Sequence, residues 1–113
     1  MYFYKSSAGN EPVRDWLLEL DKDDRKIIGV DIKAVEFGFP MGLPLVKKID
    51  GVSKLWEVRS HLKSDKIARV LFTIKDDKMI LLHGFIKKSQ KLSNQDKEIA
   101  ISRKKDIDSG GVK

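Results

Sequence analysis

Five ionisable side chains recur at odd-numbered positions in three stretches that read as β-strands. They are Glu57 and Arg59 in "LWEVRS", Arg69 in "IARVLFTIK", and His83 and Lys87 in "MILLHGFIK". Because side chains alternate across a strand, these positions share one face of a sheet if the strands pair in matching register. Two arginines, a lysine, a histidine and a glutamate then lie together, which is more charge than the solubility of a half-apolar sheet face requires.

These residue types suit metal-free cleavage of an RNA phosphodiester. The 2′-hydroxyl attacks the adjacent phosphate, a base takes its proton, an acid protonates the leaving 5′-oxygen, and cations offset the growing negative charge. Arginine suits the last task, because its planar guanidinium can bind two phosphate oxygens. Arg59 and Arg69 are therefore the first candidates, and His83, Glu57 and Lys87 are candidates to share the proton transfers. For Lys87 this requires a lowered pKa, which neighbouring arginines favour.

Further lysines are candidates to bind the backbone of the RNA or of ribosomal RNA: Lys47, Lys48, Lys63, Lys88 and Lys91. Each candidate also has a purely structural interpretation. Arg59 and Glu57 can form an ion pair that only balances charge, His83 can be a hydrogen-bonded core residue, and the lysines can keep a strand end solvated. We expect no cofactor and no metal, since the acidic run "DKDD" has no second ligand cluster and fits a helix start.

The elements that must position these side chains follow from the hydrophobic pattern. A short strand at "MYFYK" precedes a helix at "NEPVRDWLLEL", with Asn10 as its N-cap, and a second helix that runs from "DKDD" to Gly38. The middle of the chain reads as strands, namely "LVKKI", "LWEVRS", "IARVLFTIK" and "MILLHGFIK". A closing helix spans "LSNQDKEIAISRKKDI", where Ser93 and Asp96 form a variant of the capping box. The pattern predicts an α+β fold.

The hairpin between the last two strands sets which residues face the core. A three-residue turn at Asp76, Asp77 and Lys78 places the even positions of both strands on one apolar face. Two pairs are then predicted on that face, Phe72 opposite Leu82 and Val70 opposite Gly84. On the other face the same register predicts Arg69 across from Phe85 and Leu71 across from His83.

Composition predicts one small domain at residues 1–108, followed by a frayed tail at 109–113. The chain has 113 residues, 41% of them hydrophobic, which is enough for one core. It has no cysteine, and no apolar run approaches the roughly 20 residues of a membrane span. We therefore expect a soluble, cytoplasmic protein that does not bind membranes. The net charge of +6 favours an anionic partner, with nucleic acid first.

Three motifs in series resemble the toxins of the RelE/ParE superfamily, and the HigB-like group, which includes phage-derived members, is the most similar. They are "LWE-x-R", "R-x-L-F" and "LLHGF-x-KK-x-QK", and the resemblance extends from about Val13 to Ile107. It implies a small antiparallel sheet with an N-terminal helical hairpin and a C-terminal helix. Some members carry a tyrosine near the C-terminus, whereas this chain has only Tyr2 and Tyr4.

The same resemblance implies a function and partners. It implies a type II toxin–antitoxin toxin that cuts mRNA on the ribosome without a metal, together with a helix-turn-helix, HigA-like antitoxin. Two alternatives stay open. A ParE-like inhibitor of DNA gyrase has the same fold without nuclease chemistry, and a non-catalytic basic binding module needs only the cationic surface.

Overall fold

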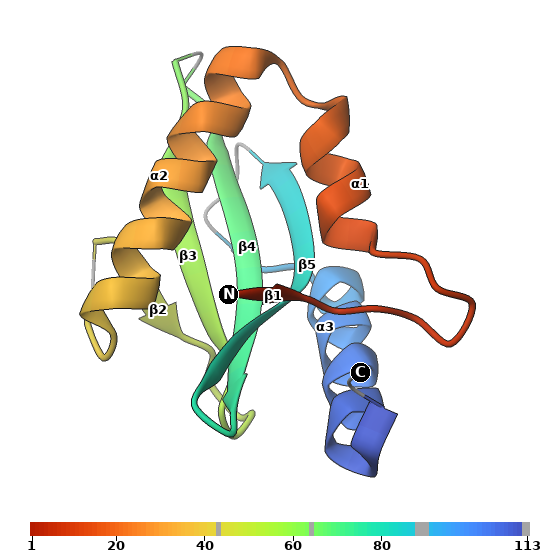
Figure 1. Ribbon diagram of the computed structural model, residues 1–113. Helices are drawn as coiled ribbons and strands as arrows, with labels where there is room; N and C mark the ends of the chain where they lie inside the picture. Colours follow the sequence, from red (N-terminus) through yellow and green to blue (C-terminus); the bar gives the residue numbers. More distant parts are fainter. Residues whose placement is uncertain (43, 64, 88–90, 112–113) are drawn as a thin grey trace.

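The structure is a computed structural model, and it describes residues 1–42, 44–63, 65–87 and 91–111 (Figure 1). Its centre is a five-stranded sheet with the strand order β1-β5-β4-β3-β2. The strands are β1 (Tyr2–Phe3), β2 (Val46–Lys48), β3 (Trp56–His61), β4 (Ile67–Lys75) and β5 (Lys78–Lys87). All neighbours pair antiparallel except β1, which runs parallel to β5. The predicted α+β class is confirmed, with this one parallel pair as an addition.

The α-helices lie on both faces of the sheet (Figure 1). The hairpin of α1 (Pro12–Glu19) and α2 (Lys22–Gly38) packs on one face, and α3 (Asn94–Asp106) packs on the other. A π-helical turn, Ile107–Gly111, continues α3. The N-cap of α1 is Glu11 rather than Asn10, which places Pro12 at the first helical position. Ser93 caps α3 as predicted, because its Oγ accepts a hydrogen bond from the Asp96 amide at 3.1 Å.

Apolar side chains pack against both faces of the sheet, so the expectation of a single core is wrong. On the helical-hairpin side, Ile28, Ile32 and Val35 of α2 meet even-numbered strand residues such as Val58, Val70 and Phe72. On the α3 side, Ala100 and Ile107 meet Leu55, Leu71 and Leu82. Leu55 and Leu71, at odd positions between the charged residues, and Leu82 of β5 belong to this second layer, which α3 covers.

The hairpin differs from the predicted one in turn length and in register. Its turn has two residues, Asp76 and Asp77, with φ angles of 52° and 63°, since Lys75 already pairs with Lys78. Positive φ at both central residues is the signature of the type I′ turn, which suits the twist of a hairpin. The two-residue turn moves Leu81 opposite Phe72, so the predicted Phe72–Leu82 pair is wrong.

A β-bulge at Leu82 then restores the predicted register. One extra residue in β5 offsets the residue missing from the turn. Ile80 and Leu82 accordingly pack on the α3 side instead of the predicted face. Beyond the bulge, Val70 pairs with Gly84, Leu71 with His83 and Arg69 with Phe85, as predicted. The pairs that bring the charged residues together are therefore correct, although the turn that was expected to produce them is not.

Candidate nucleic-acid-binding face

Strand pairing gathers the predicted site residues on the side of the sheet that α3 covers in part. Lys47 pairs with Glu57, Glu57 with Leu71, and Leu71 with His83, so these four form one row across the sheet. Arg59, Arg69 and Phe85 form the next row. We call Lys47, Glu57, Arg59, Arg69 and His83 the charged face. Neighbouring strands lie about 4.8 Å apart, so the backbones of Glu57 and His83 are about 10 Å apart.

A buried carboxylate lies at the centre of the charged face. Glu57 Oε2 is 3.8 Å from Arg69 Nη1, and Glu57 Oε1 is 3.4 Å from Arg59 Nε. Glu57 and Arg69 are each 1% exposed, whereas the Arg59 side chain is 15% exposed. Arg59 is therefore the more exposed of the two arginines, and Arg69, its cross-strand neighbour, is buried.

Burial dominates the ionisation of this pair. It raises the pKa of Glu57, against the opposing effects of Arg69, Arg59 and Lys47. Burial likewise lowers the pKa of Arg69, against the attraction of Glu57. Both pKa shifts have the same cause: the free-energy cost of removing the two charges from water exceeds the gain from their mutual attraction. The pair orders the charged face but is a weak source of stability.

His83 is held by a residue that the sequence analysis did not single out as functional. His83 Nε2 lies 2.8 Å from Asp96 Oδ1, and both side chains are largely buried. The imidazole also lies against the Phe85 ring, with centroids 5.3 Å apart. Asp96 was predicted only as part of the α3 cap. The approach of α3 to β5 brings it to His83, and no local sequence pattern signals that contact.

The remaining basic candidates are dispersed. Lys48 projects to the opposite face, where its Nζ donates to the Val52 carbonyl at 2.6 Å and lies over the Trp56 ring. Lys63 is exposed and lies 3.5 Å from Asp23 of α2. Lys91 is exposed and precedes α3. Lys88 lies outside the described residues, and the structure describes only the backbone of Lys87, which pairs with Ile67.

Within residues 1–42, 44–63, 65–87 and 91–111, no three His, Cys, Asp or Glu side chains are grouped so that they could hold a metal ion. In the same ranges, no helix has both the length and the apolar character needed to cross a membrane.

The fold and the charged face together define a small basic α+β domain with a buried carboxylate among sheet-borne cations. The chain belongs to the Gp49-like family of phage-derived proteins, because residues 15–105 match the family described as "Phage derived protein Gp49-like (DUF891)". This family is related to the RelE-like toxins of toxin–antitoxin systems. No curated protein matches the chain significantly. Membership of this family suggests that the protein is a phage-derived toxin with a cognate antitoxin.

Proposed function

We propose that this protein is the toxin of a type II toxin–antitoxin system, of the HigB-like kind, and that it is a ribosome-dependent mRNA endoribonuclease. One observation carries the proposal. The Arg59 side chain is partly exposed, lies beside the buried Glu57, and shares a sheet face with His83. Family membership supports the toxin class. The proposed reaction is 2′-hydroxyl attack on the adjacent phosphate, with no metal involved.

Each member of the charged face has a separate role in this proposal. Arg59 contacts the scissile phosphate and stabilises its growing charge. Arg69, which is buried, does not contact the substrate; it balances the charge of Glu57 and holds that side chain in place. His83 transfers the proton, and Glu57 and Lys87 are the other candidates for that step. Lys47, Lys63, Lys88 and Lys91 bind the RNA backbone, whereas Lys48 contributes only from the edge of the sheet.

The proposed partners follow from the same assignment. A helix-turn-helix, HigA-like antitoxin binds and neutralises the toxin, and the substrate is mRNA on the ribosome in the cytoplasm. Ribosomal RNA supplies the orientation that an open basic face alone lacks, so naked RNA is a poor substrate.

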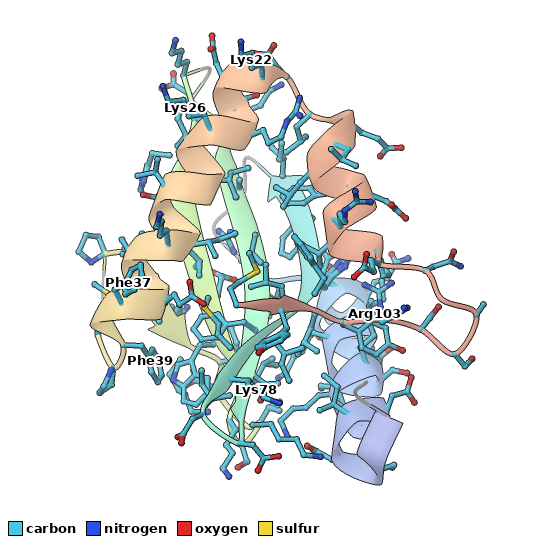
Figure 2. The ribbon with its side chains drawn as sticks, viewed as in Figure 1. Lys22, Lys26, Phe37, Phe39, Lys78 and Arg103 are labelled. Atoms are coloured by element: carbon cyan, nitrogen blue, oxygen red, sulfur yellow. The ribbon has the colours of Figure 1, made fainter. Side chains whose placement is uncertain are left out.

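Cleavage of ribosome-bound mRNA by Arg59→Ala tests the proposal. We expect the rate constant to fall by about 100-fold or more, the size of effect seen when one donor to a developing oxyanion is lost. The matched control is Lys26→Ala, which removes one positive charge from an exposed position on α2, on the opposite face of the sheet (Figure 2). Equal cleavage by the wild type and Arg59→Ala contradicts the assigned role of Arg59.

A non-catalytic binding module is the second candidate, and a specific observation favours it. Glu57 and Arg69 are buried together and His83 is bonded to Asp96, so three candidate catalytic side chains already have structural partners. This candidate predicts ribosome binding with intact mRNA. Intact mRNA together with gyrase-trapped DNA breaks instead indicates a ParE-like inhibitor.

A further inference from the structure

The contact between His83 and Asp96 joins a residue of the charged face to the first turn of α3. The two residues are 13 positions apart in the chain, and their side-chain atoms approach to 2.8 Å. Their side chains are 14% and 13% exposed, so the contact is shielded from water on most sides. A charge-assisted hydrogen bond in such surroundings restricts ring rotation more strongly than one at the surface does.

The chemistry of the two groups favours one tautomer of the neutral imidazole. An ionised carboxylate only accepts hydrogen bonds, so Nε2 of His83 carries the proton that points at Asp96 Oδ1. In the neutral ring the lone pair then belongs to Nδ1. The same carboxylate stabilises the imidazolium that forms when Nδ1 accepts a proton.

Asp96 is itself held in place by the start of α3. Its Oδ2 accepts a hydrogen bond from Ser93 Oγ at 2.7 Å, and its backbone amide donates a hydrogen bond to Ser93 Oγ at 3.1 Å. The helix N-terminus favours a negative charge at this position. Farther along α3, Arg103 Nη1 donates to the Leu82 carbonyl of β5 at 2.8 Å. The Ser93 cap thus orients the carboxylate, and the Arg103 bond is a separate contact between α3 and β5.

We propose that Asp96 is a positioning residue for His83, an inference that rests on the proposed RNA cleavage. It holds the ring and the Nε2-protonated tautomer so that Nδ1 takes the proton of the attacking 2′-hydroxyl. The O2′ electron pair forms the bond to phosphorus as the P–O5′ bond breaks. The leaving 5′-oxygen takes a proton from water, which yields a 2′,3′-cyclic phosphate and a 5′-hydroxyl, and the imidazolium returns its proton to solvent.

The test compares Asp96→Asn, Asp96→Ala and a matched control in single-turnover cleavage of ribosome-bound mRNA. Asp96→Asn keeps an acceptor oxygen but removes the charge, and we expect its rate constant at saturating ribosomes to fall by about 100-fold. Its apparent affinity for ribosomes should be unchanged, because Asp96 does not contact the substrate in this proposal. Asp96→Ala should lose at least as much activity.

The matched control is Arg103→Met, which breaks another hydrogen bond between α3 and β5 (Figure 2). If Asp96 only fastens α3 to the sheet, both changes should affect cleavage alike. We expect Arg103→Met to lower the melting temperature. Its cleavage rate constant should stay within about threefold of the wild-type value, which is a small change in activation free energy.

Nitrogen-15 NMR of His83 gives a readout that does not depend on activity. The wild type should show a ring proton on Nε2 that is shifted downfield by its carboxylate partner, and Asp96→Ala should lose this signal. Wild-type cleavage rates in Asp96→Asn, or a proton on Nδ1 in the neutral wild-type ring, overturn the inference while the proposed function stands. A wild-type protein that cleaves no mRNA overturns the proposed function, and the inference with it.

Discussion

Glu57 shows at the scale of single residues why a charged side chain on a predicted face is not always a surface group. Its carboxylate is 1% exposed and contacts both arginines of the charged face. Burial raises its pKa, although three cations oppose that change. Arg69→Ala is therefore a poor probe of chemistry, because it removes a partner from a buried carboxylate.

The Glu57–Arg69 pair gives a prediction for a double-mutant cycle. Glu57→Leu and Arg69→Met should each lower the free energy of unfolding by about 3–5 kcal/mol, because each removes one member of a buried ion pair and leaves the other charge buried. The double variant should lose less than either single variant, since no buried charge remains. Urea denaturation of the four proteins measures this coupling. Additive losses would show that the two side chains do not depend on each other.

At the scale of elements, the packing of α1 on β5 depends on a glycine in the motif "LLHGF". A Cβ placed on Gly84 would lie 2.4 Å from the Trp16 ring, so the indole occupies the space that any other side chain needs. Trp16 also packs against the apolar layer on the helical-hairpin side of the sheet. The glycine thus sets how closely α1 approaches the strand that carries His83.

We predict opposite effects for two glycine-to-alanine changes. Gly84→Ala should lower the free energy of unfolding by about 1–3 kcal/mol, the usual cost of overpacking a core. Gly29→Ala should raise it by about 0.5–1 kcal/mol, because alanine is the better helix former and nothing lies within 4 Å of the new methyl group in α2. Thermal or urea unfolding measures both. A neutral Gly84→Ala would mean that Trp16 moves aside without cost.

At the scale of the whole molecule, one hydrogen bond joins the first and last parts of the described chain. Tyr4 Oη donates to Asp106 Oδ2 at 2.5 Å, across 102 positions of sequence. The Arg103 guanidinium lies over the Tyr4 ring, with its central carbon 5.7 Å from the centroid. This contact holds the segment after β1 against the C-terminal end of α3. No sequence pattern around Tyr4 or Asp106 predicts this contact.

The Tyr4 contact predicts a pH dependence of stability. The hydrogen bond to Asp106, burial and the Asp106 charge raise the pKa of Tyr4 above its ordinary value of 10.0. The folded state therefore holds the phenolic proton more tightly than the unfolded state does. The resulting stabilisation is complete below about pH 10 and is lost as the pH rises through the folded-state pKa.

Urea unfolding of the wild type and Tyr4→Phe from pH 7 to 11 measures this effect. The variant should be less stable by about 1 kcal/mol at pH 7, the net value of a typical hydrogen bond, and the difference should shrink above pH 10. Tyr2→Phe is the matched control, since Tyr2 is exposed and should keep the wild-type pH dependence. A Tyr4→Phe difference that stays constant to pH 11 would contradict this account.

The sequence by itself determined the elements and the pairing of β4 with β5 beside the charged residues. Alternation of apolar and polar residues marked four of the strands and both faces of the sheet, because the side-chain period of a strand is two. Helical periodicity and the Ser93 cap marked the helices. The pairs Arg69–Phe85 and Leu71–His83 were predicted from a hairpin with a three-residue turn. They are correct because the extra residue of the bulge in β5 compensates for the residue that the observed two-residue turn lacks.

The tertiary structure alone decided burial and partners. Periodicity could not show that Glu57 and Arg69 are buried, that Ile80 and Leu82 pack toward α3, or that Asp96 meets His83. The last two depend on where α3 lies across the sheet. That position results from long-range packing of Ala100 and Ile107 on the sheet, and a local pattern cannot encode a contact between segments that approach only when the core forms.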